Sequence, residues 1–199
     1  DVFEELQQFT LYVAAKAFLS VDISAQGKAA AFGHAVSEMV DFYGRWIRNP
    51  ALALVPHRYM QRVPRFRRAL STMDTIVNGL IEERHQQGAD QQQEDILSLL
   101  LNARDSETGA RLSDEQIRDE VMTLLFAGHE TTASALSWTF YLLAQHPQEK
   151  RVLQEELAEV LDGRPATLGD LSDLPYTRQV IQEAMRIYPP AWGLFRVAL

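Results

Sequence analysis

The chain has 199 residues, of which 46% are apolar, with 10 glycines and 8 prolines, so it is long enough to bury a core and is neither collagen-like nor compositionally disordered. Its 19 basic and 27 acidic side chains give a formal net charge of −8, which argues against nucleic-acid binding. The chain contains no cysteine, which excludes disulfides, thiolate-bound metals and a cysteine nucleophile within these residues.

The hydropathy and the ends of the chain bear on targeting. No apolar run approaches the roughly 20 residues that a membrane-spanning helix needs. The chain begins at Asp1 without a methionine and ends at Leu199 after a proline-containing stretch, so we expect both ends to be internal to a longer protein. We predict a cytoplasmic protein with no membrane segment in this chain, and the sequence leaves open an anchor upstream of Asp1.

Helical periodicity dominates the sequence, and alternating runs typical of strands are nearly absent, which predicts an all-α, mainly helical fold. Proline-containing or polar links interrupt the pattern at 51–64 and 86–93. The predicted helices are 2–18, 28–48, 65–85, 96–101, 114–146, 147–161 and 176–188. With no internal repeat, we expect residues 1–199 to form one helical unit.

The helix that begins at residue 114 is unusually long. Ser113 and Gln116 have the spacing of a capping box at its start. No strong helix breaker follows before Pro147, so the helix is expected to run for about 30 residues. Its second half, Ala133 to Ala144, is apolar on nearly all sides and is predicted to be buried.

The segment 127–132, with the sequence Ala-Gly-His-Glu-Thr-Thr, lies in the middle of this helix. A helical glycine costs about 1 kcal/mol relative to alanine, and threonine hydroxyls can bond back to carbonyls and open the helix ladder. Glu130 is costly to bury unless another group pairs with it or uses it. The segment therefore indicates either a groove for a small polar ligand or close helix packing at Gly128, with Thr131 and Thr132 bonded locally. A zinc-protease helix is disfavoured because Ala133 stands where the second histidine is needed.

Two further features lie near the end of the chain. Glu183 and Arg186 have the i, i+3 spacing that lets them meet on one helix, although most such pairs are solvated surface pairs. The segment 188–196 combines prolines, aromatic residues and one arginine, which suits either a pocket wall or core filling.

Together these segments resemble the cytochrome P-450 family of heme-thiolate monooxygenases. The segment 127–132 resembles that family's oxygen-binding helix motif, and Glu183-Ala184-Met185-Arg186 resembles its Glu-x-x-Arg motif, in the family's order and at its distance. The flanking segments that agree are His146-Pro147-Gln148, Leu174-Pro175-Tyr176 and Arg186-Ile187-Tyr188-Pro189-Pro190.

The resemblance covers essentially the whole chain and implies the central part of a single catalytic domain, truncated at both ends, with one long central helix and without the family's small β elements. It implies heme, containing iron, as the cofactor. It also implies dioxygen and a small apolar organic substrate as ligands, and a ferredoxin or flavoprotein reductase that passes electrons from NAD(P)H.

The resemblance also implies residue roles. Thr131 would hydrogen-bond dioxygen at the heme and, with Glu130, deliver the protons that cleave the O–O bond. Glu183 and Arg186 would form a buried structural pair. The residues expected to border the heme are Ala127, Gly128, Thr131, Thr132, Ala191, Leu194 and Arg196. Those expected to border the substrate are Phe126, Trp192 and Phe195, with Phe42 and Tyr43 as further candidates in the lid.

The family's cysteine loop, Phe-x-x-Gly-x-Arg-x-Cys, is absent, so no residue of this chain can be the iron ligand and the isolated chain is expected to be inactive. The monooxygenase function is therefore assigned to the full-length parent. Two alternatives are a non-catalytic, all-helical domain that binds a hydrophobic ligand or regulates, and a truncated product that folds poorly. A cysteine loop in the parent gene would distinguish the monooxygenase function from both of these alternatives.

Overall fold

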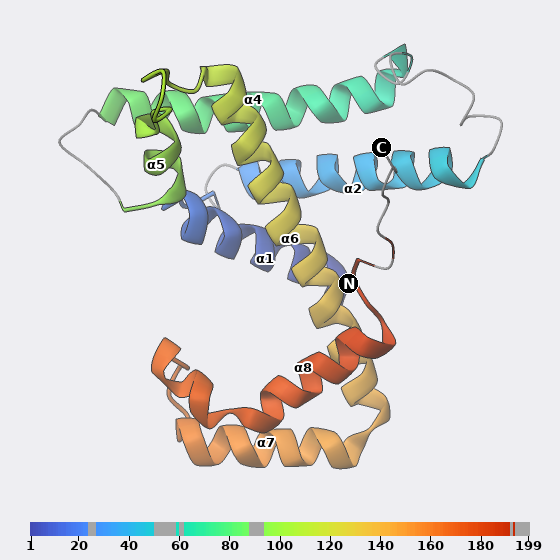
Figure 1. Ribbon diagram of the computed structural model, residues 1–199. Helices are drawn as coiled ribbons and strands as arrows, with labels where there is room; N and C mark the ends of the chain where they lie inside the picture. Colours follow the sequence, from blue (N-terminus) through green and yellow to red (C-terminus); the bar gives the residue numbers. More distant parts are fainter. Residues whose placement is uncertain (24–26, 50–58, 60–61, 88–93, 192, 194–199) are drawn as a thin grey trace. The chain divides into compact units, whose positions relative to one another are not determined.

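The computed structural model describes residues 1–23, 27–49, 59, 62–87, 94–191 and 193. Over these ranges the regular structure is helical, apart from one isolated β-bridge between Arg104 and Arg111, which confirms the all-α prediction. The elements, shown in Figure 1, are α1 (Val2–Leu19), α2 (Lys28–Arg48), α4 (Pro64–Gln87), α5 (Ile96–Asn102), α6 (Asp114–Gln145), α7 (Pro147–Leu161), the 3₁₀ helix η4 (Leu168–Asp173) and α8 (Pro175–Ile187). No helix among the described residues is both long enough and apolar enough to cross a bilayer.

Helix boundaries follow the signals in the sequence. Ser113 and Gln116 form the predicted capping box, with the Ser113 amide donating to Gln116 Oε1 at 2.9 Å and the Gln116 amide donating to Ser113 Oγ at 3.3 Å. Pro147 opens α7, where the missing amide hydrogen costs nothing. The long helix α6 contains 32 residues, as the absence of a breaker predicts.

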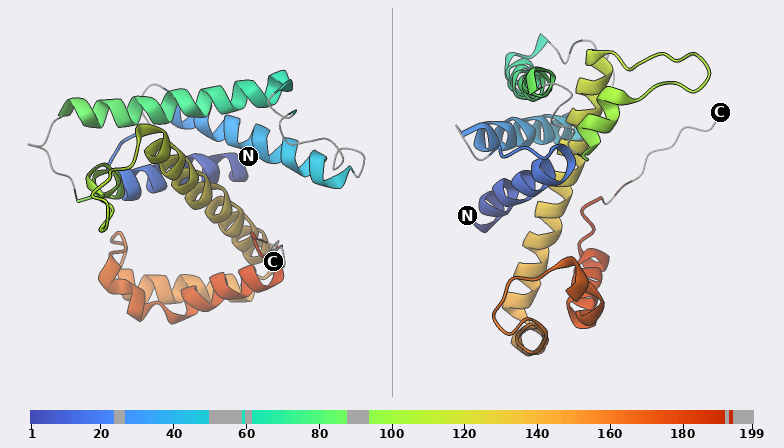
Figure 2. Two further views of the ribbon diagram at one scale, coloured as in Figure 1. Left: turned by 45° about the horizontal axis from the view of Figure 1, so that its top comes forward. Right: turned by 90° about the vertical axis from the view of Figure 1, so that its left-hand side faces the viewer.

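The chain divides into two compact units, which are described separately. The first comprises Gln7–Glu130. Within it α2 and α4 lie side by side, as Figures 1 and 2 show. Its core is a single apolar cluster that stabilises the unit by removing side chains from water. The largest fully buried members are Leu11, Leu19, Phe32, Val36, Met73, Val77, Leu80, Leu97, Val121 and Leu125.

A buried ion pair anchors the start of α5 in this unit. The Arg84 guanidinium donates to Asp95 Oδ1 at 2.9 Å, to Ser98 Oγ at 2.8 Å and to the carbonyl of Leu19. Only 7% of the Arg84 side chain and 1% of the Asp95 side chain are exposed. Burial opposes ionisation of Asp95, but the hydrogen bonds from Arg84 and Ser98 outweigh it and hold the pKa of Asp95 below its usual value.

The second unit comprises Asp1–Leu6 and Thr131–Leu199. Here α7 and α8 lie side by side (Figures 1 and 2). Glu156 of α7 accepts from the Tyr176 and Thr177 amides at 2.7 and 2.8 Å, which satisfies two orphan donors in the first turn of α8. Burial opposes ionisation of Glu156, yet these bonds and the Thr177 hydroxyl keep its pKa below the usual value.

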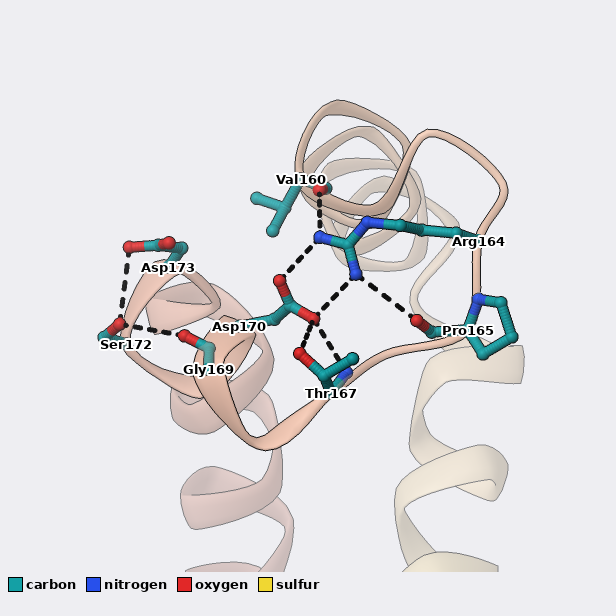
Figure 3. Close-up of polar contacts among 8 residues, drawn as sticks. All are labelled: Val160, Arg164, Pro165, Thr167, Gly169, Asp170, Ser172 and Asp173. Carbon is teal, nitrogen blue, oxygen red and sulfur yellow. Dashed lines mark hydrogen bonds and ion pairs between the residues drawn. The ribbon is translucent and has the colours of Figure 1, made fainter.

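The link between α7 and α8 is held by a cluster of side chains shown in Figure 3. Asp170 accepts two hydrogen bonds from the Arg164 guanidinium, at 2.6 and 2.8 Å, and two from the Thr167 amide and hydroxyl, at 2.7 and 2.8 Å. Thr167 and Asp170 thereby form a capping box for η4. The Arg164 fork and the Thr167 donors hold the pKa of Asp170 well below its usual range.

The prediction that Ala133 to Ala144 is buried is wrong for the described part of the chain. Phe140 is 53% exposed, and Tyr141 and Trp138 are also exposed, although Trp138 stacks on Tyr188 with ring centroids 4.2 Å apart. An apolar pattern shows which side chains are stabilised by burial, but it does not show what covers them. In the described part of the chain, other residues cover only part of this stretch of α6.

Candidate functional site

Helix α6 carries the predicted oxygen-binding segment at the point where it packs on α1. A Cβ atom built on Gly128 would lie 2.9 Å from Phe18 Cε2 and 3.4 Å from the Ala14 Cβ. Both α1 residues would collide with or crowd any larger side chain, so the glycine permits the close approach of the two helices. The packing role that the sequence left open for Gly128 is therefore present in the structure.

A hydrogen bond joins the same two helices at the next residue of α6. The Thr10 hydroxyl, which is buried, lies 3.0 Å from the carbonyl oxygen of His129 and 3.2 Å from that of Gln7. A carbonyl in mid-helix normally accepts only from the amide four residues on, so a side-chain donor here engages the ladder of α6 inside the motif. The threonine that does this comes from α1 and not from the motif itself.

His129 points into the core of the first unit. Its side chain is 0% exposed, and among the described residues neither ring nitrogen has a hydrogen-bond partner. A Cβ on Gly33 would lie 3.9 Å from His129 Nε2, so the imidazole occupies space that α2 leaves open. Burial lowers the pKa of His129 to about 4, because the protonated ring would lose its hydration. The ring is neutral at physiological pH.

Glu130 is paired, as its predicted cost of burial requires. Its Oε2 accepts a hydrogen bond of 2.9 Å from Gln7 Nε2, and the same nitrogen donates to Ser37 Oγ at 3.1 Å. The Glu130 carboxylate also lies near His129, with 4.0 Å between Oε2 and Nδ1. Glu130, Gln7 and Ser37 thus form a polar cluster contributed by α6, α1 and α2, and this set of residues is called the Gln7 cluster below.

The remaining motif side chains lie on accessible parts of α6. Phe126, Ala127, Thr131 and Thr132 are exposed, whereas His129 is buried and Gly128 faces α1. Residues four apart share a helix face, so Ala127 and Thr131 place a methyl group and a hydroxyl one turn apart on an open surface.

The Glu183 and Arg186 side chains meet as predicted, through a two-pronged contact with both distances 2.7 Å. The Arg186 fork holds the pKa of Glu183 below its usual value. In this chain 56% of the Glu183 side chain and 70% of the Arg186 side chain are exposed, so burial of the pair in the full-length protein stays a prediction. Burial of this pair needs a covering segment, and the described residues around α8 do not supply one.

A groove of about 360 Å³, lined in part by Glu183, lies between the end of α6 and helices α7 and α8. It is lined mostly by apolar side chains such as Leu142, Val180 and Ile187. None of the motif residues 126–132 lines it. The groove is therefore separate from the chemistry that the motif indicates.

The other predicted ligand contacts fall into two groups. Phe42 and Tyr43 belong to an aromatic cluster on α2 and α4, where the Phe42 ring lies 4.9 Å from that of Phe66. Ala191 lies within the described part of the chain and is exposed. The predicted residues Trp192, Leu194, Phe195 and Arg196 lie outside the described residues.

The whole chain, residues 1–199, matches the family model described as "Cytochrome P450". This chain belongs to the cytochrome P450 family. It is 38% identical over 194 residues to a protein of Streptomyces melanosporofaciens named "Cyclooctatin synthase", an alignment that covers 96% of this chain and 41% of that protein. It is 39% identical over 144 residues to "Bifunctional cytochrome P450/NADPH--P450 reductase 1" of Bacillus subtilis, covering 71% of this chain and 14% of that protein.

A solved structure gives the same result for the cytochrome P450 fold. The chain is similar to the crystal structure of a cytochrome P450DA heme domain, with a TM-score of 0.71 and 28% sequence identity over 93% of this chain and 39% of that one. The chain spans about two fifths of the length of the cyclooctatin synthase that it matches. The family and fold that the motifs indicated are confirmed.

The family implies heme, and Ala127 and Thr131 are exposed on α6, as contacts with one side of that cofactor require. Ala127 is small enough to lie flat against a macrocycle, and Thr131 offers a hydroxyl one turn away. The residues of this chain do not fit the other side, since the chain contains no cysteine that could be the thiolate ligand of the iron.

Sequence reasoning did not identify Gln7, Ser37 or Thr10. Single polar residues on amphipathic helices give no pattern that separates them from solvated positions. The available signal was Glu130 itself, whose position on a helix expected to be buried requires a donor from a neighbouring helix.

Proposed function

We propose that the full-length protein is a heme-dependent monooxygenase that inserts one oxygen atom of dioxygen into an apolar organic substrate. The other oxygen atom leaves as water, which consumes two electrons and two protons in each turnover. The observation that supports this most is the cytochrome P450 motif at residues 127–132 of the long helix α6, with Ala127, Thr131 and Thr132 exposed, in a chain that belongs to the family.

Heme, when bound, supplies the binding and activation of dioxygen. The residues of this chain would deliver protons and leave room for the cofactor and the substrate. Thr131 would donate a hydrogen bond to dioxygen beside α6, and Glu130 would pass protons from solvent toward Thr131. Ala127 would leave room for the cofactor beside α6, and Gly128 would set the position of this stretch by its close packing on α1. Thr132, Ala191, Leu194 and Arg196 would complete the heme contacts. Phe126, Trp192 and Phe195 border the substrate.

Electrons are proposed to come from NAD(P)H through a ferredoxin or flavoprotein reductase. The Bacillus relative, whose name joins a cytochrome P450 to a reductase, supports a flavoprotein-type partner. We propose a cytoplasmic location. The isolated chain is proposed to be inactive, because it has no cysteine to bind the iron.

The test uses the full-length gene product, loaded with heme and supplied with a reductase, in an atmosphere of ¹⁸O₂. The proposal requires one ¹⁸O atom in the product for each NAD(P)H consumed. Thr131→Ala is expected to bind substrate normally but to divert most electrons to hydrogen peroxide. Label from water instead of dioxygen, or no oxygenated product with any apolar substrate in a broad panel, contradicts the proposed function.

Thr123→Ala is the matched control. Thr123 is exposed two turns earlier on the same helix, and its hydroxyl donates to the Asp119 carbonyl at 2.8 Å. The control variant is expected to keep the wild-type ratio of product to NAD(P)H. An equal loss of coupling in both variants would remove the assignment of Thr131.

A further inference from the structure

The Gln7 cluster ties the acid of the motif to two other helices. Gln7 is 8% exposed and Glu130 is 21% exposed at the side chain, so both groups are largely withdrawn from water. A carboxylate only accepts hydrogen bonds, which fixes the Gln7 amide with its NH₂ group toward Glu130. That nitrogen has two hydrogens, one for Glu130 and one for Ser37 Oγ.

The backbone around the cluster is held in place as well. Thr10, one turn after Gln7 on α1, bonds the carbonyl of His129 at 3.0 Å. Gly128 lets α1 approach closely on the same stretch of α6. The distance between Gln7 and Glu130 is therefore set by packing and does not depend on two freely moving side chains.

The hydrogen bond from Gln7 turns the Glu130 carboxylate toward α1. Successive residues on a helix project about 100° apart, so a Glu130 carboxylate bound to α1 does not face the position toward which Thr131 projects. For Glu130 to pass a proton to the Thr131 side from this orientation, a water molecule must lie between the carboxylate and Thr131. The hydrogen bond from Gln7 then controls the orientation of the Glu130 carboxylate relative to Thr131.

We propose that Gln7, supported by Ser37, is a positioning residue for proton delivery, holding the Glu130 carboxylate on the α1 side of α6 so that protons reach the Thr131 position only through this one orientation. The inference rests on the proposed monooxygenase function. A purely structural role is the competing explanation, because any buried amide needs partners. That role predicts a loss of stability alone.

The experiment compares Gln7→Met, which keeps the size of the side chain and removes both donors, with Gln8→Met, the same substitution at the exposed neighbouring position of α1. Both are made in the full-length, heme-loaded protein. In Gln7→Met the fraction of NAD(P)H electrons recovered in product is expected to fall about 3- to 10-fold, and the solvent deuterium isotope effect on kcat is expected to rise, with KM unchanged. Gln8→Met is expected to match wild type.

A second comparison places both substitutions in a Glu130→Gln background. Because Gln7 acts only through Glu130, Gln7→Met is expected to cause no further loss there. Equal losses in the two backgrounds, or a wild-type product fraction and isotope effect in Gln7→Met, overturn the inference. Should Gln7→Met fail to take up heme, Ser37→Ala decides. It leaves the Gln7 amide without its second anchor and is expected to shift product fraction and isotope effect in the same direction by less, whereas wild-type values overturn the inference.

The failures are distinguishable. If wild type and Gln8→Met form no oxygenated product, the proposed function is wrong and this inference falls with it. If both form product and the Gln7 and Ser37 variants behave like them, the monooxygenase function stands and only the role of Gln7 is wrong.

Discussion

The ring of Phe18 on α1 fills the space in which Gly128 of α6 would carry a side chain, with only 2.9 Å between Phe18 Cε2 and a Cβ built at that glycine. Distances this short are not tolerated between carbon atoms, so the Phe18 ring or one of the two helices must shift when a methyl group is added. The glycine of the family motif is thus also a packing residue in this chain.

Gly128→Ala is expected to destabilise the protein by about 1 kcal/mol, since overpacking costs more than the gain in helix propensity. Gly79→Ala is the matched control, because Gly79 lies inside α4 with open space at its Cβ position. It is expected to stabilise by about 0.5–1 kcal/mol. Chemical unfolding of both variants measures the difference, and a Gly128→Ala protein as stable as Gly79→Ala contradicts the packing role.

Arg84→Met is expected to cost about 3–5 kcal/mol of stability, because it leaves the buried Asp95 carboxylate without its partner. The matched control is Arg45→Met, whose ion pair with Asp41 is exposed on both sides. That change is expected to cost less than about 0.5 kcal/mol. Thermal and urea unfolding provide the measurement, and similar costs for the two arginines rule out a special role for the buried pair.

His129 makes the stability of the protein depend on pH. The folded pKa of about 4 lies below the ordinary value near 6.5 that the unfolded chain has, so the unfolded state binds more protons between these two values. Stability is therefore expected to fall as the pH drops from about 6.5 to 4, by at most about 1.4 kcal/mol per pH unit. Above this window the His129 contribution is constant.

His129→Leu is expected to remove this slope and to be no less stable than wild type at pH 7, because no described hydrogen bond to the ring is lost. Denaturant unfolding of both proteins at several pH values between 4 and 7 gives the slope as a difference, which cancels the contribution of the carboxylates. Parallel stability curves for the two proteins over this range would falsify the assignment.

The helices could be predicted from the sequence because their signals are local. Ser113, Pro147 and the apolar spacing place the ends of α6 and α7 within one or two residues. The helix η4 was missed because a 3₁₀ helix of six residues is too short to show periodicity, although Thr167 and Asp170 have capping-box spacing.

The site could be predicted only in part. The motif at 127–132 and the meeting of Glu183 with Arg186 follow from residue type and helical spacing. The donors to Glu130 and to the His129 carbonyl both come from α1, 123 and 119 residues away in the chain, and no local rule connects them. Burial of the Glu183 pair stays a prediction for the full-length protein, because spacing specifies that two side chains meet, and not what covers them.

The most direct test of the monooxygenase account is the difference spectrum of the full-length gene product, reduced in the presence of carbon monoxide. A thiolate ligand donates electron density to the iron and moves the Soret band to longer wavelength than a histidine ligand does. The account predicts the thiolate band, at one heme per chain, and a Phe-x-x-Gly-x-Arg-x-Cys loop in the gene after the codon for Leu199. A spectrum without heme absorption, or with the band of a histidine-bound heme, would contradict it.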